Sequence, residues 1–166
     1  MRFFQLIALI AILALAGALG WRYYQLENLP REPLPALTLE PVMDLPAFGD
    51  LATGEPALLH FWGAACAPCR AEHALLMALR DEGIAIYGIA SDESALDSAN
   101  FLAELGNPYL GSMRDVEGQS AQALLVETYP TTFILSADGE MVGRVDGPID
   151  VSVLRNEIYP VLDRES

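Results

Sequence analysis

The sequence predicts an α/β fold in which helices flank a central mixed sheet, carried behind one apolar N-terminal segment. Strand-like and helix-like segments alternate along residues 58–159. Among them, residues 84–90 form an apolar run that is typical of a buried parallel strand. Further on, residues 132–136 and 140–145 flank an Asp138-Gly139 turn and predict a hairpin. The alternation and the hairpin together indicate a largely parallel sheet with an antiparallel edge.

Local signals define where the predicted elements begin and end. Gly83 is placed to end the helix that starts at residue 67, and Ser94 is suited to cap the next helix. The last helix is expected to stop near Pro160, because proline interrupts a helix interior. Residues 106–118 contain proline and glycine and are expected to form a loop-rich insertion. In chain order, the predicted strands and helices cover residues 58–62, 67–82, 84–90, 94–105, 119–127, 132–136, 140–145 and 151–159.

Residues 1–22 predict an N-terminal transmembrane anchor. Residues 3–20 contain Gln5 as their only polar side chain, and about 18 such residues can span a bilayer. Aromatic residues follow at once, as they do at a membrane interface: Trp21, Tyr23 and Tyr24. A cleaved signal peptide is the alternative, with residues 14–16 as the cleavage triplet, although the apolar run continues past that point. In both cases the rest of the chain is expected to be exported.

The exported part is predicted to be one domain behind a linker. Residues 23–41 hold four prolines, which are too many for a helix or a central strand, and are expected to form a stiff linker. Residues 42–166 have the length of one ordinary domain and can bury a core without extra disulfides.

The composition limits the classes of function. The 166 residues include nine basic side chains, all arginine, against 23 acidic ones, for a formal charge of −14. This charge excludes nucleic-acid binding, which needs a basic surface. It favours solubility and would steer basic partners towards the domain.

The only two cysteines carry the clearest chemical signal. Cys66 and Cys69 are separated by two residues and lie between a predicted strand and a predicted helix. Unpaired N–H groups and a partial positive charge at a helix N-terminus favour a thiolate at the first cysteine, and the thiolate is the attacking species. The second cysteine, about one turn on, can then release the product from a mixed disulfide. Arg70 is close enough to add positive potential.

Two other interpretations of the cysteine pair are weaker. A structural disulfide that closes so short a loop constrains the unfolded chain little. A zinc site would need His60 in the strand and His73 on the helix to complete its ligands, and that spacing matches no common zinc pattern. No metal site is therefore predicted, and a redox pair is favoured.

The chain resembles the CcmG/DsbE family of cytochrome c biogenesis thiol:disulfide interchange proteins, which have a thioredoxin-like fold. The resemblance spans nearly the whole chain and is carried by residues 61–73, 104–109 and 129–139, together with the apolar N-terminus and the proline-rich lead-in. The Arg-Ala-Glu-His and Glu-Leu-Gly-Asn-Pro-Tyr segments point to this family, whereas the cysteine motif alone would indicate only the thioredoxin superfamily.

The resemblance implies a reductase in the bacterial periplasm, held by one span in the inner membrane. Its substrate would be the disulfide in the haem-attachment Cys-X-X-Cys-His segment of apocytochrome c, and its electron donor a membrane reductant of the DsbD type. Cys66 would be the nucleophile and Cys69 the resolving thiol, with no cofactor beyond their disulfide. The resemblance also implies a cis peptide before Pro130. The backbone at Tyr129 would then pair with an extended substrate, and Thr131 would adjoin it.

Three positions depart from the family pattern. Ala65 stands where tryptophan usually precedes the first cysteine, and Thr131 stands where glutamate often follows the proline. His60 occupies the position of a proton-transferring aspartate in thioredoxins. Its imidazole could take that role or be a strand histidine satisfied by hydrogen bonds. We expect Trp62 to pack beside the site and Pro68 to tune it.

Other assignments stay open at the level of sequence. Glu72 is expected on the surface of the helix, and His73 on the surface or in packing. A broader TlpA-like reductase with a different periplasmic client would share the same chemistry. A non-enzymatic copper or apoprotein carrier is the alternative from another class, although related copper carriers usually place three residues between their cysteines.

Overall fold

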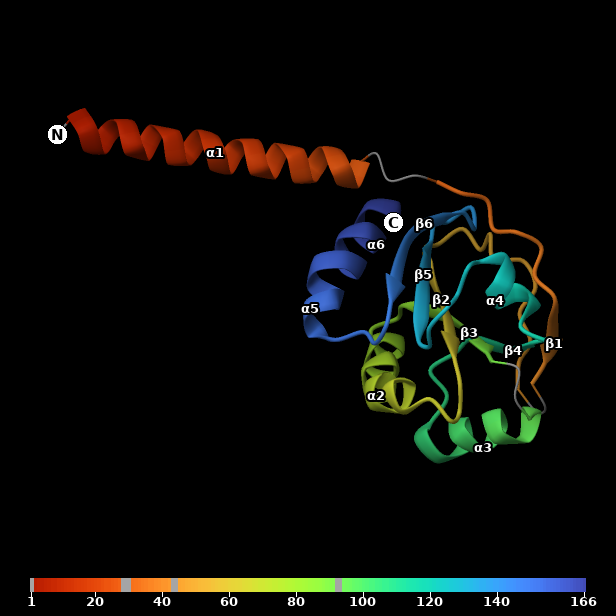
Figure 1. Cartoon of the computed structure of the whole chain (residues 1–166). Coiled ribbons are helices and arrows are strands. Elements are labelled where there is room, and N and C mark those ends of the chain that lie inside the picture. The colour runs from red at the N-terminus through yellow and green to blue at the C-terminus, as the bar shows by residue number, and fades with distance from the viewer. Residues whose placement is uncertain (1, 28–30, 43–44, 92–93) are drawn as a thin grey trace. The chain divides into compact units, whose positions relative to one another are not determined.

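The computed structural model describes residues 2–27, 31–42, 45–91 and 94–166 (Figure 1). The chain divides into two compact units, Met1–Pro30 and Arg31–Ser166. The first unit contains helix α1 (Arg2–Glu27), whose described side chains are almost all exposed and apolar. Within the described residues, no helix has the length and apolarity that crossing a membrane requires. The anchor predicted for residues 1–22 therefore stays a prediction.

The second unit is built on a six-stranded mixed sheet in the order β1-β4-β3-β2-β5-β6. Strand β2 is parallel to β3, and β3 is parallel to β4, whereas the remaining pairings are antiparallel. The predicted mixed sheet with an antiparallel edge is confirmed. The strands are β1 (Leu39–Pro41), β2 (Ala57–Trp62), β3 (Ala85–Ala90), β4 (Gly111–Asp115), β5 (Thr131–Leu135) and β6 (Met141–Asp146).

Two sequence predictions about strands are wrong in part. The segment 106–118 is not a loop-rich insertion throughout, because it contains β4, which pairs with β3 in the sheet. Residues 39–41, assigned to the linker, form β1 at the sheet edge. Pro41 is tolerated there because an edge strand leaves one side of its backbone unpaired.

Helices flank the sheet, whose two edges are β1 and β6 (Figure 1). They are α2 (Ala67–Asp81), α3 (Ala95–Leu105), α4 (Gln119–Ala123), α5 (Val151–Val153), the π-helical turn η1 (Leu154–Ile158) and α6 (Tyr159–Glu165). Helix α4 is shorter than the predicted 119–127, because Leu125 adopts a left-handed conformation with φ 52°. The prediction that Pro160 stops the last helix is wrong. The helical run continues from Val151 through Pro160 to Glu165, and the π-helical turn η1 lies just before the proline.

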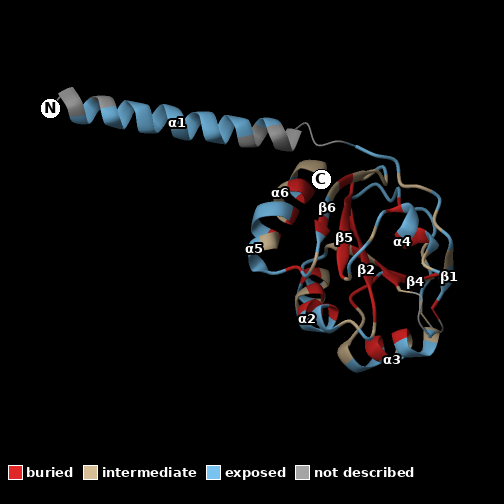
Figure 2. Cartoon of the chain, viewed as in Figure 1, coloured by how far each residue is buried: buried red, intermediate tan, exposed pale blue. Residues whose placement is uncertain are grey.

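Strand β2 forms the centre of the core. All six of its residues are buried, because strands pair with it on both sides and helices cover the sheet (Figure 2). Phe61 packs edge-on against Phe133 of β5, with ring centroids 5.9 Å apart. His60 is the one ionisable side chain in this strand and is fully buried. Strand β2 thus carries one polar side chain through the middle of the core.

A methyl group at Gly88 of β3 is expected to lower the free energy of unfolding by about 1–3 kcal/mol. The added Cβ would lie 2.8 Å from the ring of Tyr109, which stacks on Trp62 and His60 and has little room to move. Urea denaturation of Gly88→Ala and the wild type measures the loss. Gly49→Ala is the matched control, because a Cβ there meets no atom within 4 Å. Equal stability of the Gly88 variant and the wild type would contradict the expected clash.

Candidate functional site: a disulfide at the start of helix α2

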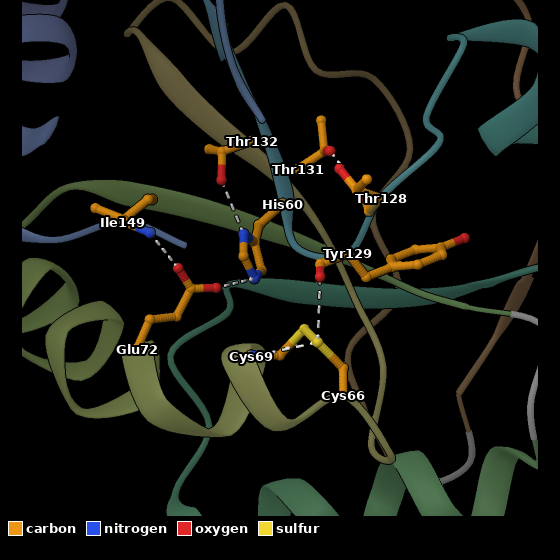
Figure 3. Close-up of a disulfide and its surroundings, with 9 residues drawn as sticks. All are labelled: His60, Cys66, Cys69, Glu72, Thr128, Tyr129, Thr131, Thr132 and Ile149. Atoms are coloured by element: carbon orange, nitrogen blue, oxygen red, sulfur yellow. Dashed lines mark hydrogen bonds and ion pairs between the residues drawn. A yellow bond between two sulfur atoms is a disulfide. The ribbon is translucent and has the colours of Figure 1, made fainter. Parts of the chain in front are cut away.

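The two cysteines form a disulfide at the N-terminus of α2, with their Cα atoms 5.3 Å apart (Figure 3). Strand β2 ends at Trp62, and a short loop leads to Cys66, which is the N-cap residue. The Sγ atom of Cys66 accepts a hydrogen bond from the backbone N–H of Cys69 at 3.1 Å. Pro68 lies in the first turn of the helix, where a backbone N–H would have no acceptor within the helix, so the N–H that proline lacks costs no hydrogen bond.

The two sulfur-bearing residues differ in access to solvent. Cys66 is half-buried, whereas Cys69 is 2% exposed. Of the two cysteines, Cys66 is therefore the one that a partner molecule can approach from solvent. This asymmetry matches the roles of attacking and resolving thiol predicted for Cys66 and Cys69.

A loop far along the chain completes the site. The peptide bond between Tyr129 and Pro130 is cis, as the resemblance implied. The carbonyl oxygen of Tyr129 lies 3.5 Å from the Sγ atom of Cys66, and Figure 3 shows it directed at the disulfide. The sheet brings the two together, because β5 starts directly after Pro130 and runs antiparallel to β2.

A buried pair of ionisable side chains, His60 and Glu72, lies beside the disulfide (Figure 3). The Nε2 atom of His60 lies 3.4 Å from a carboxyl oxygen of Glu72, and Nδ1 lies 3.0 Å from the hydroxyl of Thr132. The other carboxyl oxygen of Glu72 accepts the backbone N–H of Ile149 at 2.5 Å. The prediction that Glu72 lies on the helix surface is therefore wrong.

Burial decides the charges of this pair. It lowers the pKa of His60 to about 3, with a smaller contribution from His73. It raises the pKa of Glu72 to about 7, against the opposing effect of the Ile149 N–H. Above pH 3 the imidazole is neutral, so the pair is not an ion pair in the acidic range. The carboxyl group of Glu72 is protonated in the acidic range and loses its proton near neutral pH.

Sequence reasoning missed Glu72, but a signal was present. Glu72 follows Cys69 by three residues, so both lie on one face of the helix. Since Cys69 had to face the core, Glu72 had to face it as well. His73, the next residue, is also buried, and its Nε2–H donates to the carbonyl of Gly106 at 2.9 Å. This bond supports the packing role expected for His73.

The remaining predicted residues surround the disulfide. The Arg70 guanidinium donates to the carboxylate of Glu104 at 3.0 Å and lies over the ring of Phe101, so part of its positive potential is neutralised. Trp62 is buried and packs against Phe101 and Tyr109, as expected for a packing residue. Ala65 is exposed and borders a shallow cavity of about 310 Å³.

Thr131 does not point to solvent. It is fully buried at the start of β5, and its hydroxyl lies 2.9 Å from the Thr128 carbonyl and 3.1 Å from a carboxyl oxygen of Asp146. A carboxylate therefore adjoins position 131, although the side chain at that position is neutral. In the parts of the chain that the structure describes, no three His, Cys, Asp or Glu side chains are grouped as metal ligands would be.

This fold and disulfide define the chain as a thioredoxin-like thiol–disulfide oxidoreductase. Solved structures share the fold at low sequence identity. A thiol-disulfide isomerase from Corynebacterium glutamicum has a TM-score of 0.66 and 16% identity, over 82% of this chain and 97% of that one. StoA from Bacillus subtilis has a TM-score of 0.56 and 21% identity, over 73% and 95%.

Sequence comparison defines the family. The chain is 31% identical to the thiol:disulfide interchange protein HelX of Rhodobacter capsulatus, over 92% of this chain and 93% of the relative. It is 34% identical to the thiol:disulfide interchange protein DsbE of Escherichia coli K12, over 97% and 94%. No protein-family model matches the chain. The chain belongs to the DsbE/HelX family of thiol:disulfide interchange proteins.

Replacing Glu72 by glutamine is expected to change how stability depends on pH. The folded-state pKa of Glu72 is raised from 4.5 to about 7. The native protein therefore keeps a proton that the unfolded chain loses between these values. Wild-type stability supplied by this group is complete below pH 4.5 and is lost as pH rises to 7. We expect the free energy of unfolding of the variant, relative to that of the wild type, to rise by about 3 kcal/mol across that range.

Denaturation of the oxidised proteins at pH 4.5, 6 and 8 measures this difference. The lowered pKa of His60 has the opposite pH dependence, but His60 is present in both proteins and cancels in the comparison. A stability difference that does not change with pH would show that Glu72 ionises normally in the folded state.

Proposed function

We propose that this protein is an exported reductase that acts on the disulfide of the Cys-X-X-Cys-His segment in apocytochrome c during cytochrome c maturation. Membership of the DsbE/HelX family supports thiol–disulfide exchange as the reaction. The observation that carries the direction of attack is the unequal exposure of the two cysteines at the helix N-terminus. The choice of client rests on the family resemblance.

The reaction begins with both cysteines reduced. The thiolate of Cys66 attacks one sulfur of the substrate disulfide, that bond breaks, and the departing substrate thiolate takes up a proton. Cys66 and the substrate are then joined in a mixed disulfide. The thiolate of Cys69 attacks the Cys66 sulfur, and the second substrate thiolate leaves. Two electrons have passed to the substrate, and the Cys66–Cys69 disulfide has formed.

An extended substrate would lie along the backbone at Tyr129 and Pro130. The 3.5 Å between the Tyr129 carbonyl and the Cys66 sulfur brings main-chain pairing next to the reacting atom. A substrate bound strand to strand would present its disulfide to Cys66. Thr131 supports this loop from β5 rather than contacting the substrate with its side chain, since it is buried.

The resolving step needs a base, because Cys69 must lose its proton before it attacks. Glu72 lies one turn along the same face of α2, and its pKa of about 7 allows it to accept a proton near neutral pH. The Nε2 atom of His60 lies 3.4 Å from one carboxyl oxygen, and the backbone N–H of Ile149 holds the other. In this proposal Glu72 takes the proton-transfer role first considered for the histidine.

The cycle closes when a membrane-embedded reductant of the DsbD type reduces the Cys66–Cys69 disulfide. We place the domain in the periplasm, with the apolar N-terminal segment as an inner-membrane anchor or as a signal peptide. Export would explain the use of a single, chemically active cysteine pair in an oxidising compartment.

Single cysteine variants test the assignment of attack and resolution. Cys69→Ser should accumulate a stable mixed disulfide between Cys66 and a peptide that contains an oxidised Cys-X-X-Cys-His segment, because nothing releases the peptide. Cys66→Ser should form no adduct and show no turnover. Mass spectrometry under non-reducing conditions detects the adduct. An adduct that forms on Cys69 in the Cys66→Ser variant at the same rate would reverse the two roles.

The client and the direction of electron flow need separate measurements. Deletion of the gene should abolish c-type cytochromes while leaving other exported disulfide proteins intact, and retention of the cytochromes would point to another client. Equilibration with glutathione or dithiothreitol should give a reduction potential near the roughly −270 mV of thioredoxin or modestly above it. A potential near the roughly −120 mV of DsbA would make the protein an oxidant.

A further inference from the structure

The loop that faces Cys66 is held in an unfavourable conformation. Residues 124–130 connect α4 to β5 without regular structure and carry the Tyr129 carbonyl to its position 3.5 Å from the sulfur. At the start of this loop the backbone of Leu125 has φ 52°, a left-handed conformation that residues other than glycine and asparagine rarely adopt. Its side chain is 72% exposed, so packing does not hold it there.

Arg144 of β6 fixes the start of the loop. Its guanidinium donates to the carbonyl of Leu124 at 2.9 Å and to that of Leu125 at 2.8 Å. These two carbonyls terminate α4 and would otherwise lack helix partners. The guanidinium also lies over the ring of Phe133, its neighbour on β5. One side chain from another strand thus holds the residue with the unusual backbone.

Thr131 and Asp146 fix the other end of the loop. The Thr131 hydroxyl proton is shared between the Thr128 carbonyl at 2.9 Å and the Asp146 carboxylate at 3.1 Å. Thr131 and Asp146 are directly paired across β5 and β6. The next residue, Gly147, donates its backbone N–H to the Pro130 carbonyl at 2.9 Å. The residues on both sides of Tyr129 are therefore held, Thr128 by Thr131 of β5 and Pro130 by Gly147 after β6.

A charged hydrogen bond joins the two ends. The Nε atom of Arg144 donates to both carboxyl oxygens of Asp146, at 2.9 and 3.1 Å. This bond, with a smaller contribution from Thr131, lowers the pKa of Asp146, so the carboxylate stays ionised over the working pH range. Thr131, Asp146 and Arg144 form one continuous network, which we call the β5–β6 network.

We propose that the β5–β6 network positions the Tyr129 carbonyl next to Cys66. Through this carbonyl the network affects the reactivity of Cys66 and the binding of an extended substrate. The proposal rests on the proposed function for the second of these effects. The printed hydrogen bonds connect the network to Cys66 through the loop that carries the Tyr129 carbonyl.

The position of the carbonyl has two consequences. When Cys66 is reduced, its thiol can donate to the Tyr129 carbonyl, which favours the thiol over the thiolate. The same backbone serves as the pairing edge for an extended substrate. Loosening the loop should therefore make Cys66 more acidic while weakening substrate binding. A general loss of structure would not produce this pair of opposite effects.

The Thr131→Val substitution that tests this proposal leaves the other charged groups near Cys66 in place. Arg70 lies on α2 with its partner Glu104 from α3, and His60 with Glu72 lies between β2 and α2. The Thr131→Val variant alters none of them. A change in the acidity of Cys66 would therefore come from the Tyr129 loop.

Thr131→Val tests the network at its uncharged member. The pKa of Cys66, taken from the pH dependence of its alkylation by iodoacetamide, should fall by about 0.5–1 unit. The kcat/KM for an oxidised Cys-X-X-Cys-His peptide should fall about fivefold to tenfold, mainly through KM. Thr131→Ser should restore both values. Arg144→Lys should act in the same direction, since one ammonium group cannot reproduce the three guanidinium contacts.

Arg114→Gln is the matched control, because it breaks a pair between Arg114 and Glu40 at the far edge of the sheet. It should leave both readouts unchanged. An unaltered alkylation profile and unaltered KM in Thr131→Val would overturn the proposal, as would a fall in rate without the shift in acidity. Alkylation needs no client, so a wild type that fails to reduce the peptide would reject the proposed function while still testing the network.

Discussion

The pairing of β2 with a strand on each side is the constraint on which the site depends. Its carboxyl end leads into the loop that reaches Cys66, and the antiparallel β5 begins at the same edge of the sheet, directly after Pro130. Phe61 and Thr131 are the last paired residues at that edge. Backbone hydrogen bonds in the core thereby bring Tyr129 to a cysteine that lies 63 residues away in sequence. The position of the reactive sulfur is thus a property of the sheet as much as of the helix.

Opposing electrostatic effects then act on the sulfur of Cys66. The N-terminus of α2 favours a thiolate at Cys66, whereas the Tyr129 carbonyl disfavours it. Cys69 is buried, and Glu72 follows it by three residues on the same face of α2. In the proposed reaction Glu72 takes up the proton that Cys69 loses before it attacks the mixed disulfide.

Local patterns predicted most of the architecture, because alternating apolar segments, caps and turn residues act over short distances. The cysteine pair, the helix that follows it and the hairpin are examples. Strand β4 was missed because Gly111 and the charged Arg114 resemble a loop, and only pairing with β3 and β1 makes them a strand. The network that holds Leu125 was beyond sequence reasoning for the same reason. It depends on the β5–β6 register, which no local pattern specifies.

The two polar departures from the family pattern share a physical feature. At position 60 a neutral imidazole faces the carboxyl group of Glu72, and at position 131 a neutral hydroxyl faces that of Asp146. In each case the acidic group comes from a neighbouring element, α2 or β6, rather than from the strand position itself. At both positions the carboxyl group thus belongs to a neighbouring side chain and not to residue 60 or 131 itself. The position of each carboxyl group therefore depends on contacts between elements, and not on residue 60 or 131 alone.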